Sequence, residues 1–262
     1  MDRPIGVLDS GVGGLTVLKL MGKMLEHEDI IYFGDSKNVP YGNKSEDEIY
    51  QLTIKILDYF KSRNVKMVAI ACNTISTIID RFKGKYDFPI VDIINPTVDH
   101  IYKMGIHKLV ILGTDFTIKT RVYERLLKQR DKTMEIGSEN SPELASLIDM
   151  GDFNSKKLRD TVKGHLDRIS EMGDYYNIVL ACTHYPLVED IFLDINPTLN
   201  YINPGFQQAK FMRVILSNEG KLKKSGRPSV EILTSGDTNK YKMMVDRLEI
   251  KNTKNIESYD LG

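Results

Sequence analysis

The two cysteines of this sequence share one local pattern, and that pattern suits proton transfer at carbon. Cys72 follows the apolar run 67–71 and Cys182 follows the run 178–181; in both places an alanine precedes the cysteine and small polar residues follow it. A free thiol has a pKa of about 8.5, so one cysteine can be a thiolate while the other is protonated. Facing one carbon from opposite sides, such a pair can invert a stereocentre without a cofactor.

Other interpretations of the cysteines are weaker because the two share a context. An isolated cysteine is more often a small buried hydrophobe than an acid or base. A disulfide between these two is disfavoured in a reducing cytosol. The sequence has no cluster of cysteines and no helical pairing of histidine with carboxylate, so we expect no metal site. We therefore expect two free thiols.

Each cysteine has a candidate polar partner. Asp9 follows the first apolar run, and His184 lies just beyond Cys182. A charged or hydrogen-bonding neighbour changes the proton affinity of a thiol. We therefore predict the pairs Asp9 with Cys72 and His184 with Cys182. The other histidines are interpreted as structural: His27, His100, His107 and His165.

A glycine-rich loop at residues 9–14 joins the first predicted strand to a helix, and its backbone can approach an anion closely. The dinucleotide fingerprint is incomplete, because Thr16 stands where its third glycine belongs, and no lysine completes a phosphate loop. We expect the loop to bind a small carboxylate. The alternative is that it is only a tight turn between strand and helix.

Two further loops carry candidate ligand-binding residues. Tyr41 and Gly42 follow the second predicted strand, where the tyrosine either closes over a ligand or packs within a turn. Thr114 and Thr117 follow the run 109–112, where they can cap the next helix, hydrogen-bond a ligand, or do both.

Short apolar runs alternate with amphipathic segments along the chain, which predicts an α/β fold with mostly parallel sheets. The predicted strands are 5–8, 30–33, 67–71, 90–93, 109–112, 178–181 and 230–233. The predicted helices include 46–63, 117–129, 155–172 and 206–217. Ligands of such folds gather at the carboxyl ends of the strands, where both cysteines are expected. Turn residues at Asn95-Pro96 and Asn203-Pro204-Gly205 indicate two domain crossings.

The composition argues against nucleic acids and membranes as binding partners. The 36 basic and 36 acidic residues cancel, so no long-range positive field favours nucleic acid or an anionic membrane. No apolar stretch reaches the roughly 18 residues of a membrane span, and the N-terminus lacks the layout of a secretory signal. We expect a cytoplasmic protein that binds a small molecule.

Taken together, these stretches resemble the glutamate racemases of the aspartate/glutamate racemase superfamily over nearly the whole chain. The matching pieces, in order, are residues 9–16, 40–42, 71–74, 113–114, 181–187 and 234–237. The resemblance implies two pseudo-symmetric α/β domains with the active site in the cleft between them. It places the first domain at residues 1–95 plus 206–262 and the second at 96–205.

The resemblance also implies the activity and the site. The implied reaction is cofactor-free interconversion of L- and D-glutamate, which supplies D-glutamate for peptidoglycan, the cell wall and cell shape. The residue matching Cys182 deprotonates the L-isomer, and that matching Cys72 deprotonates the D-isomer. A homodimer is the expected assembly. The implied substrate-binding positions are Asp9, Ser10, Tyr41, Gly42, Asn73, Thr74, Thr114, Thr117, Thr183 and His184.

Two positions depart from the family pattern. Asp149 stands where the family commonly has a longer glutamate, which leaves an auxiliary acid role there doubtful. Asn203 replaces the aspartate of an Asp-Pro-Gly stretch. Neither change touches the thiols. Two alternatives stay open: a racemase of aspartate or another amino acid, and a non-catalytic regulatory protein that binds a small anion.

Overall fold

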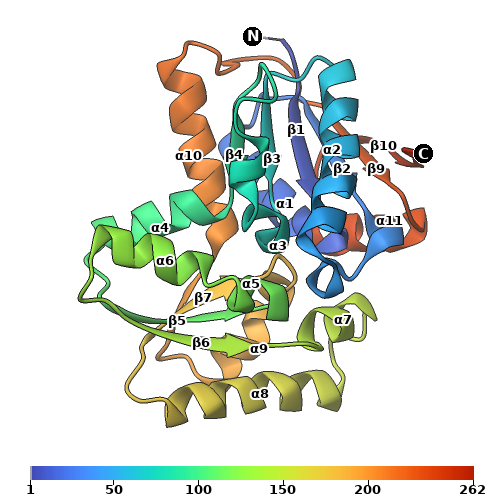
Figure 1. Ribbon diagram of the computed structural model, residues 1–262. Coiled ribbons are helices and arrows are strands. Elements are labelled where there is room, and N and C mark those ends of the chain that lie inside the picture. Colours follow the sequence, from blue (N-terminus) through green and yellow to red (C-terminus); the bar gives the residue numbers. More distant parts are fainter. Residues whose placement is uncertain (1) are drawn as a thin grey trace.

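The computed structural model describes residues 2–262 as two parallel β-sheets with helices on both faces of each (Figure 1). The larger sheet has the strand order β10-β9-β2-β1-β3-β4 and the smaller has β6-β5-β7-β8. The strands are β1 Ile5–Asp9, β2 Ile30–Gly34, β3 Met67–Ile70, β4 Ile90–Asp92, β5 Lys108–Gly113, β6 Glu135–Asn140, β7 Asn177–Ala181, β8 Asn200–Ile202, β9 Val230–Thr234 and β10 Thr253–Ser258.

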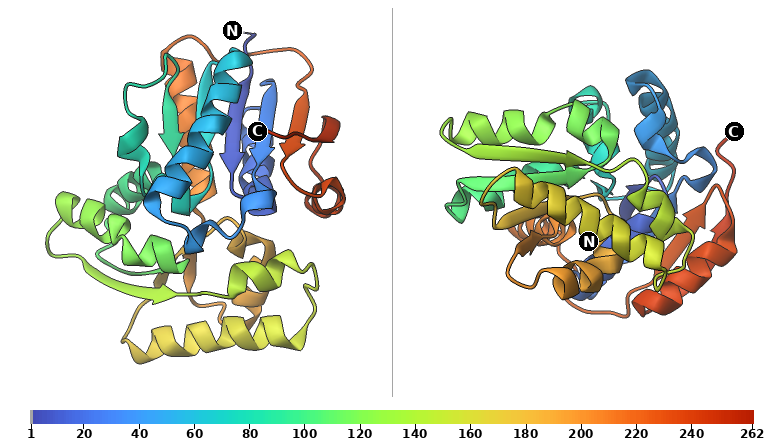
Figure 2. Two further views of the ribbon diagram at one scale, coloured as in Figure 1. Left: turned by 45° about the vertical axis from the view of Figure 1, so that its right-hand side comes forward. Right: turned by 90° about the horizontal axis from the view of Figure 1, so that it is seen from below.

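Helices connect the strands and cover the sheets. They are α1 Leu15–Met24, α2 Glu46–Ser62, α3 Asn73–Ser76, α4 Ile94–Lys103, α5 Asp115–Lys119, α6 Val122–Arg130, α7 Leu144–Asp149, α8 Lys156–Glu171, α9 Glu189–Ile195, α10 Pro204–Asn218 and α11 Thr238–Leu248. Helices α1, α10 and α11 pack together on one face of the larger sheet, and α2 lies on the other. Helices α6 and α8 cover opposite faces of the smaller sheet (Figure 2).

Burial on both faces explains why the strands appear in the sequence as continuous apolar runs. Along β1, Val7 joins the core under α1, whereas Leu8 joins the core under α2. Because successive side chains of a strand point to opposite faces, a strand covered on both faces needs apolar residues at nearly every position. All five residues of β1 and of β2 are buried accordingly.

The two sheets repeat one strand order. The order β2-β1-β3-β4 of the larger sheet corresponds to β6-β5-β7-β8 of the smaller. Strands β3 and β7 therefore occupy equivalent places, and Cys72 and Cys182 lie just beyond their carboxyl ends. In such sheets the connections diverge beside the first strand, and ligands bind at that point, outside the carboxyl ends. The topology thus puts both cysteines where this fold class binds ligands.

All seven predicted strands are present, but the structure adds β6, β8 and β10. Strand β6 is a polar edge strand, so it lacks the apolar run by which the others were found. The predicted helix 117–129 is wrong as a single helix: it divides into α5 and α6 at Arg121, whose φ of 50° lies in the left-handed region. Within residues 2–262, the helices are all too short or too polar for a transmembrane segment.

Candidate active site

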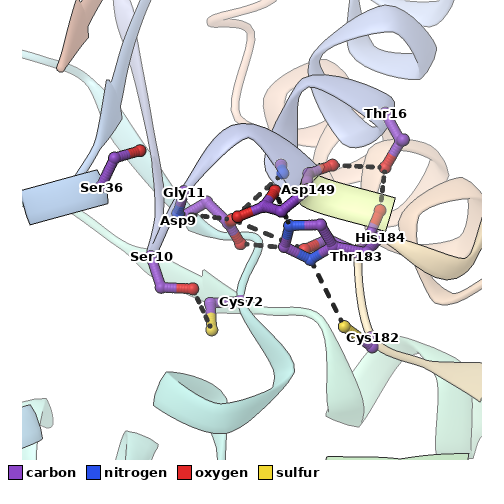
Figure 3. A network of polar contacts seen from close by, with 12 residues as sticks. Asp9, Ser10, Gly11, Thr16, Ser36, Cys72, Asp149, Cys182, Thr183 and His184 are labelled. Carbon is purple, nitrogen blue, oxygen red and sulfur yellow. Dashed lines mark hydrogen bonds and ion pairs between the residues drawn. The ribbon is translucent and has the colours of Figure 1, made fainter. Parts of the chain in front are cut away.

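A cavity of about 110 Å³ lies between the carboxyl ends of the two sheets. Both cysteines line it, and both are free thiols. The other lining residues are Ser10, Val39, Pro40, Tyr41, Gly42, Asn73, Thr74, Thr114, Ala145, Ser146, Asp149, Ala181, Thr183 and His184. Figure 3 shows the two sulfur atoms beside a polar network, each joined by a dashed line to its own neighbour.

Cys72 lies at the amino-terminal end of α3. Its Sγ is 3.5 Å from the Ser10 hydroxyl, so the direct partner of this thiol is Ser10 and not the predicted Asp9. Burial raises the pKa of Cys72 to about 12, and the negative charge of Asp9 contributes in the same direction. Asp9 therefore acts on Cys72 through its charge, and the thiol form is favoured in the free protein.

Cys182 has a charged partner. Its Sγ lies 3.6 Å from Nδ1 of His184, and Nε2 of the same ring lies 2.9 Å from Oδ1 of Asp149. Burial lowers the pKa of His184, but its hydrogen bonds to Asp149 and Cys182 outweigh burial and raise that pKa well above the ordinary 6.5. A protonated His184 donates to both partners and attracts negative charge at the Cys182 sulfur.

Asp149 completes this arrangement from α7, a helix of the smaller sheet's domain. Burial raises the pKa of its carboxyl, but the hydrogen bond from His184 outweighs burial and keeps that pKa below its ordinary value. The shorter side chain at this position therefore still reaches the imidazole. The sequence left an auxiliary role for Asp149 doubtful; the structure places it in direct contact with His184.

The glycine-rich loop holds the carboxylate of Asp9 from the same loop. The backbone N–H groups of Gly11 and Gly14 both donate to Asp9 Oδ2 at 3.1 Å. The Thr183 hydroxyl donates to Asp9 Oδ1 at 3.3 Å from the other sheet's domain. Burial outweighs these bonds and raises the pKa of Asp9. The expectation that the loop's glycines bind a substrate carboxylate is therefore wrong for Gly11 and Gly14, whose N–H groups Asp9 occupies.

Gly13 and Gly14 are needed for close approach. A Cβ added to Gly13 would lie 2.6 Å from both Nδ1 of His184 and Oγ1 of Thr183. A Cβ at Gly14 would lie 2.4 Å from the Cβ of Asp9. Real Cβ atoms do not come this close to other atoms, so only glycine lets the loop pack against the residues that follow Cys182.

Asn73, Thr74 and Thr114 form a polar wall of the cavity, whereas the predicted binding residues Thr117 and Asp9 lie behind the lining residues. The Thr74 hydroxyl lies 3.1 Å from that of Thr114 and 3.5 Å from that of Thr117, so this cluster joins α3 to the start of α5. Thr114 also caps α5 by accepting from the Thr117 N–H at 3.3 Å. Asn73 is buried, and its Nδ2 has no hydrogen-bond partner.

Tyr41 and Gly42 close one side of the cavity. The Tyr41 hydroxyl donates to Asp35 Oδ2 at 2.6 Å, so this phenol is held by a buried carboxylate. Gly42 faces Thr114: a Cβ added to Gly42 would lie 3.5 Å from the Cβ of Thr114, an ordinary van der Waals distance. The tyrosine therefore shapes the wall of the cavity while its hydroxyl is engaged behind it.

Some residues of this site were outside the sequence-based prediction. Ala145 and Ser146 come from α7 beside Asp149, which the sequence had marked only as a departure from the family pattern, and Asp35 lies behind Tyr41. The signal for Asp35 was its place directly after the second predicted strand, beside the loop of Tyr41. The predicted residues Cys72, Cys182 and His184 do meet in one cavity.

The geometry agrees with the comparisons to known proteins. The model of the Asp/Glu/Hydantoin racemase family matches residues 5–198, and the chain belongs to this family. Glutamate racemases from two Thermoanaerobacter strains match it over nearly the whole chain. The one from Thermoanaerobacter pseudethanolicus is 34% identical over 262 residues, covering 99% of this chain and 98% of the relative.

Solved structures give the same result. Glutamate racemase isoform RacE1 from Bacillus anthracis has a TM-score of 0.92 at 27% identity, covering 99% of this chain and 98% of that one. The glutamate racemase from Francisella tularensis, solved in complex with D-glutamate, has a TM-score of 0.91 at 27% identity, with 99% and 98% covered. The two-sheet α/β fold predicted from the sequence is confirmed.

Replacement of Gly13 by alanine should lower kcat/KM about 100-fold. The added methyl group would overlap His184 and Thr183, so the imidazole or the loop must move by up to about 1 Å. Steady-state racemisation kinetics would measure this. Gly22→Ala is the matched control, because a Cβ there meets nothing within 4 Å. It should keep full activity and stabilise α1 by about 0.5–1 kcal/mol. Full activity in Gly13→Ala would contradict the packing described above.

Asp149→Asn should lower the melting temperature by a few degrees, and this decrease should be largest at mildly acidic pH. A histidine whose pKa is raised on folding stabilises the protein fully below its unfolded pKa, and this stabilisation is lost as pH rises through the folded pKa. The difference from wild type should therefore be greatest below about pH 6.5 and shrink at alkaline pH. Thermal melts across this range test it, and a pH-independent difference would exclude a charged pair.

Proposed function

We propose that this protein interconverts L- and D-glutamate, without a cofactor, by proton transfer between Cys72 and Cys182. The observation that carries the proposal is that two free thiols, equivalent in the two sheets, line one cavity. One base alone would tend to return the proton to the face it came from. Two thiols on opposing sides remove that bias, and the family membership supports the same reaction.

In the direction from L to D, the Cys182 thiolate removes the proton from Cα. The Cα–H bond breaks, its electron pair stays on the substrate carbon, and the proton moves to the Cys182 sulfur. The Cys72 thiol then gives its proton to the opposite face of Cα. Protonated His184 favours the starting thiolate, and the raised pKa of Cys72 keeps the second thiol protonated.

The reverse direction starts from the exchanged state, with Cys72 as thiolate and Cys182 as thiol. The negative charge of Asp9 opposes a thiolate at Cys72, so proton uptake by Asp9, whose own pKa is raised, would ease this step. Asp9 and His184 are therefore proposed as auxiliary groups that adjust the two thiols.

The substrate would be held by groups that surround the cavity. The free Nδ2 of Asn73 and the hydroxyls of Thr74 and Thr114 are suited to the substrate carboxylates. The remaining proposed binding positions are Asp9, Ser10, Tyr41, Gly42, Thr117, Thr183 and His184. Glutamate is favoured over aspartate by the family relationship: the Francisella relative was solved with D-glutamate.

We place the domain boundaries at 95–96 and 205–206, so that residues 1–95 plus 206–262 carry the larger sheet and 96–205 the smaller. We also propose a role in supplying D-glutamate for peptidoglycan in the cytoplasm, where free thiols persist.

A homodimer is proposed too, supported by the exposed apolar residues Phe206, Phe211 and Val214 on α10. Sedimentation as a monomer at micromolar concentration would exclude the dimer.

Without any added cofactor, the purified protein should turn D-glutamate into a racemic mixture and act on D-aspartate far more slowly. Optical rotation follows both reactions. A clear preference for aspartate would overturn the substrate assignment, and no turnover of either would favour a non-catalytic binding protein.

Each of the variants Cys72→Ser and Cys182→Ser should lose activity by a factor of roughly 100 to 10,000, because a serine hydroxyl is a far weaker acid–base group than a thiol. Circular dichroism should show that both remain folded.

In deuterium oxide, the product formed by the wild-type protein should acquire deuterium at Cα, while the remaining substrate exchanges little. Rapid exchange with retention of configuration would indicate a single base.

A further inference from the structure

The side-chain amide of Asn73 is held by a tyrosine from the other half of the molecule. Asn73 directly follows Cys72 and opens α3, beside the larger sheet, whereas Tyr123 belongs to α6, which covers the smaller sheet. The Tyr123 hydroxyl donates to Asn73 Oδ1 at 2.7 Å. Both residues are only 2% exposed, so water does not compete for this contact.

In the structure the amide has one orientation, with its oxygen toward Tyr123. An asparagine amide has an acceptor oxygen at one end and an N–H donor group at the other, and its terminal torsion has little preference between the two orientations. With Oδ1 engaged by Tyr123, the opposite end, Nδ2, is left buried and without a partner. A buried donor without a partner is costly, so the free protein holds this N–H group ready for an acceptor.

The acceptor would come from the cavity, because Asn73 is one of its lining residues. Carboxylate oxygens accept strongly from N–H donors and cannot donate. An amide turned the other way would present its oxygen to a carboxylate and repel it. The orientation that Tyr123 fixes is therefore the one that suits an anionic substrate.

Tyr123 is a neutral phenol, and in this structure its hydroxyl donates to Asn73. Burial, with a smaller contribution from the charge of Asp92, raises its pKa well above the ordinary 10.0, so the phenol keeps its proton at neutral pH. Tyr123 does not line the cavity. Its effect on a ligand would pass through Asn73.

We propose that Tyr123 is a positioning residue that orients the Asn73 amide, so that Nδ2 donates to a carboxylate oxygen of the substrate. The proposal rests on the proposed racemisation of glutamate. It also ties substrate binding to the contact between the halves, because the Tyr123–Asn73 bond exists only while α6 lies against α3.

Tyr123→Phe should raise KM for both glutamate enantiomers about 10-fold, with kcat changed less than threefold; this corresponds to about 1.4 kcal/mol of binding. Tyr201→Phe is the matched control, because it also removes one hydrogen-bonded phenol hydroxyl. The Tyr201 hydroxyl donates to the backbone carbonyls of Phe192 and Asn196, away from the cavity. It should leave KM unchanged, although both variants lose some thermal stability.

A double-mutant cycle separates positioning from general damage. Asn73→Ala should raise KM by itself, and adding Tyr123→Phe in that background should raise it no further, because the amide that Tyr123 orients is gone. Independent, additive effects of the two substitutions would overturn the proposal. So would an unchanged KM in folded Tyr123→Phe while wild type racemises glutamate normally.

A measurement on wild type covers the case in which Tyr123→Phe does not fold. The Asn73 side-chain amide signals in a nitrogen-15 NMR spectrum should shift on addition of D-glutamate, with slower exchange of one amide proton. Unperturbed signals at saturating D-glutamate would refute the proposal. Absence of wild-type turnover would instead refute the function on which it rests.

Discussion

The contact between the carboxyl ends of the two sheets is the constraint on which the site depends. Each sheet supplies one thiol, so neither half can perform a two-base reaction alone. The contact is made at very short range, with Gly13 against Thr183 and His184 and with Asp9 accepting from Thr183. Packing this close fixes the two sulfurs relative to each other without any covalent link between them.

The repeated strand order makes the two thiols topologically equivalent, yet their surroundings differ. Cys72 has a hydroxyl neighbour and a buried carboxylate nearby, whereas Cys182 has an imidazole that is itself paired with a carboxylate. The first environment raises the pKa of the Cys72 thiol, and the second sets an imidazole with a raised pKa beside the Cys182 sulfur. This difference supports the proposal that one cysteine acts first as the acid and the other as the base, although both groups are chemically the same.

Much of the fold could be predicted from the sequence because parallel strands buried on both faces must be continuously apolar. The same rule missed β6, whose residues are polar because it lies at an edge. The places of Cys72, Cys182 and His184 followed from the rule that ligands gather at strand ends. Contacts between distant segments, such as Asp149 with His184 or Tyr123 with Asn73, leave no periodic pattern and required coordinates. The sequence also could not show that Asp9 would occupy the N–H groups of Gly11 and Gly14 in its own loop.

The chain passes between the halves twice, and the helices at these passages, α4 and α10, pack against each other. Figure 1 shows both at one side of the molecule, with α7 at the other. Two adjacent connections can act as a hinge, and the halves would then separate most easily at the edge far from them. The opening for a ligand would then lie between the loop of Tyr41 and α7, while Asp149 and His184, which both belong to the half of the smaller sheet, would move together and keep their contact.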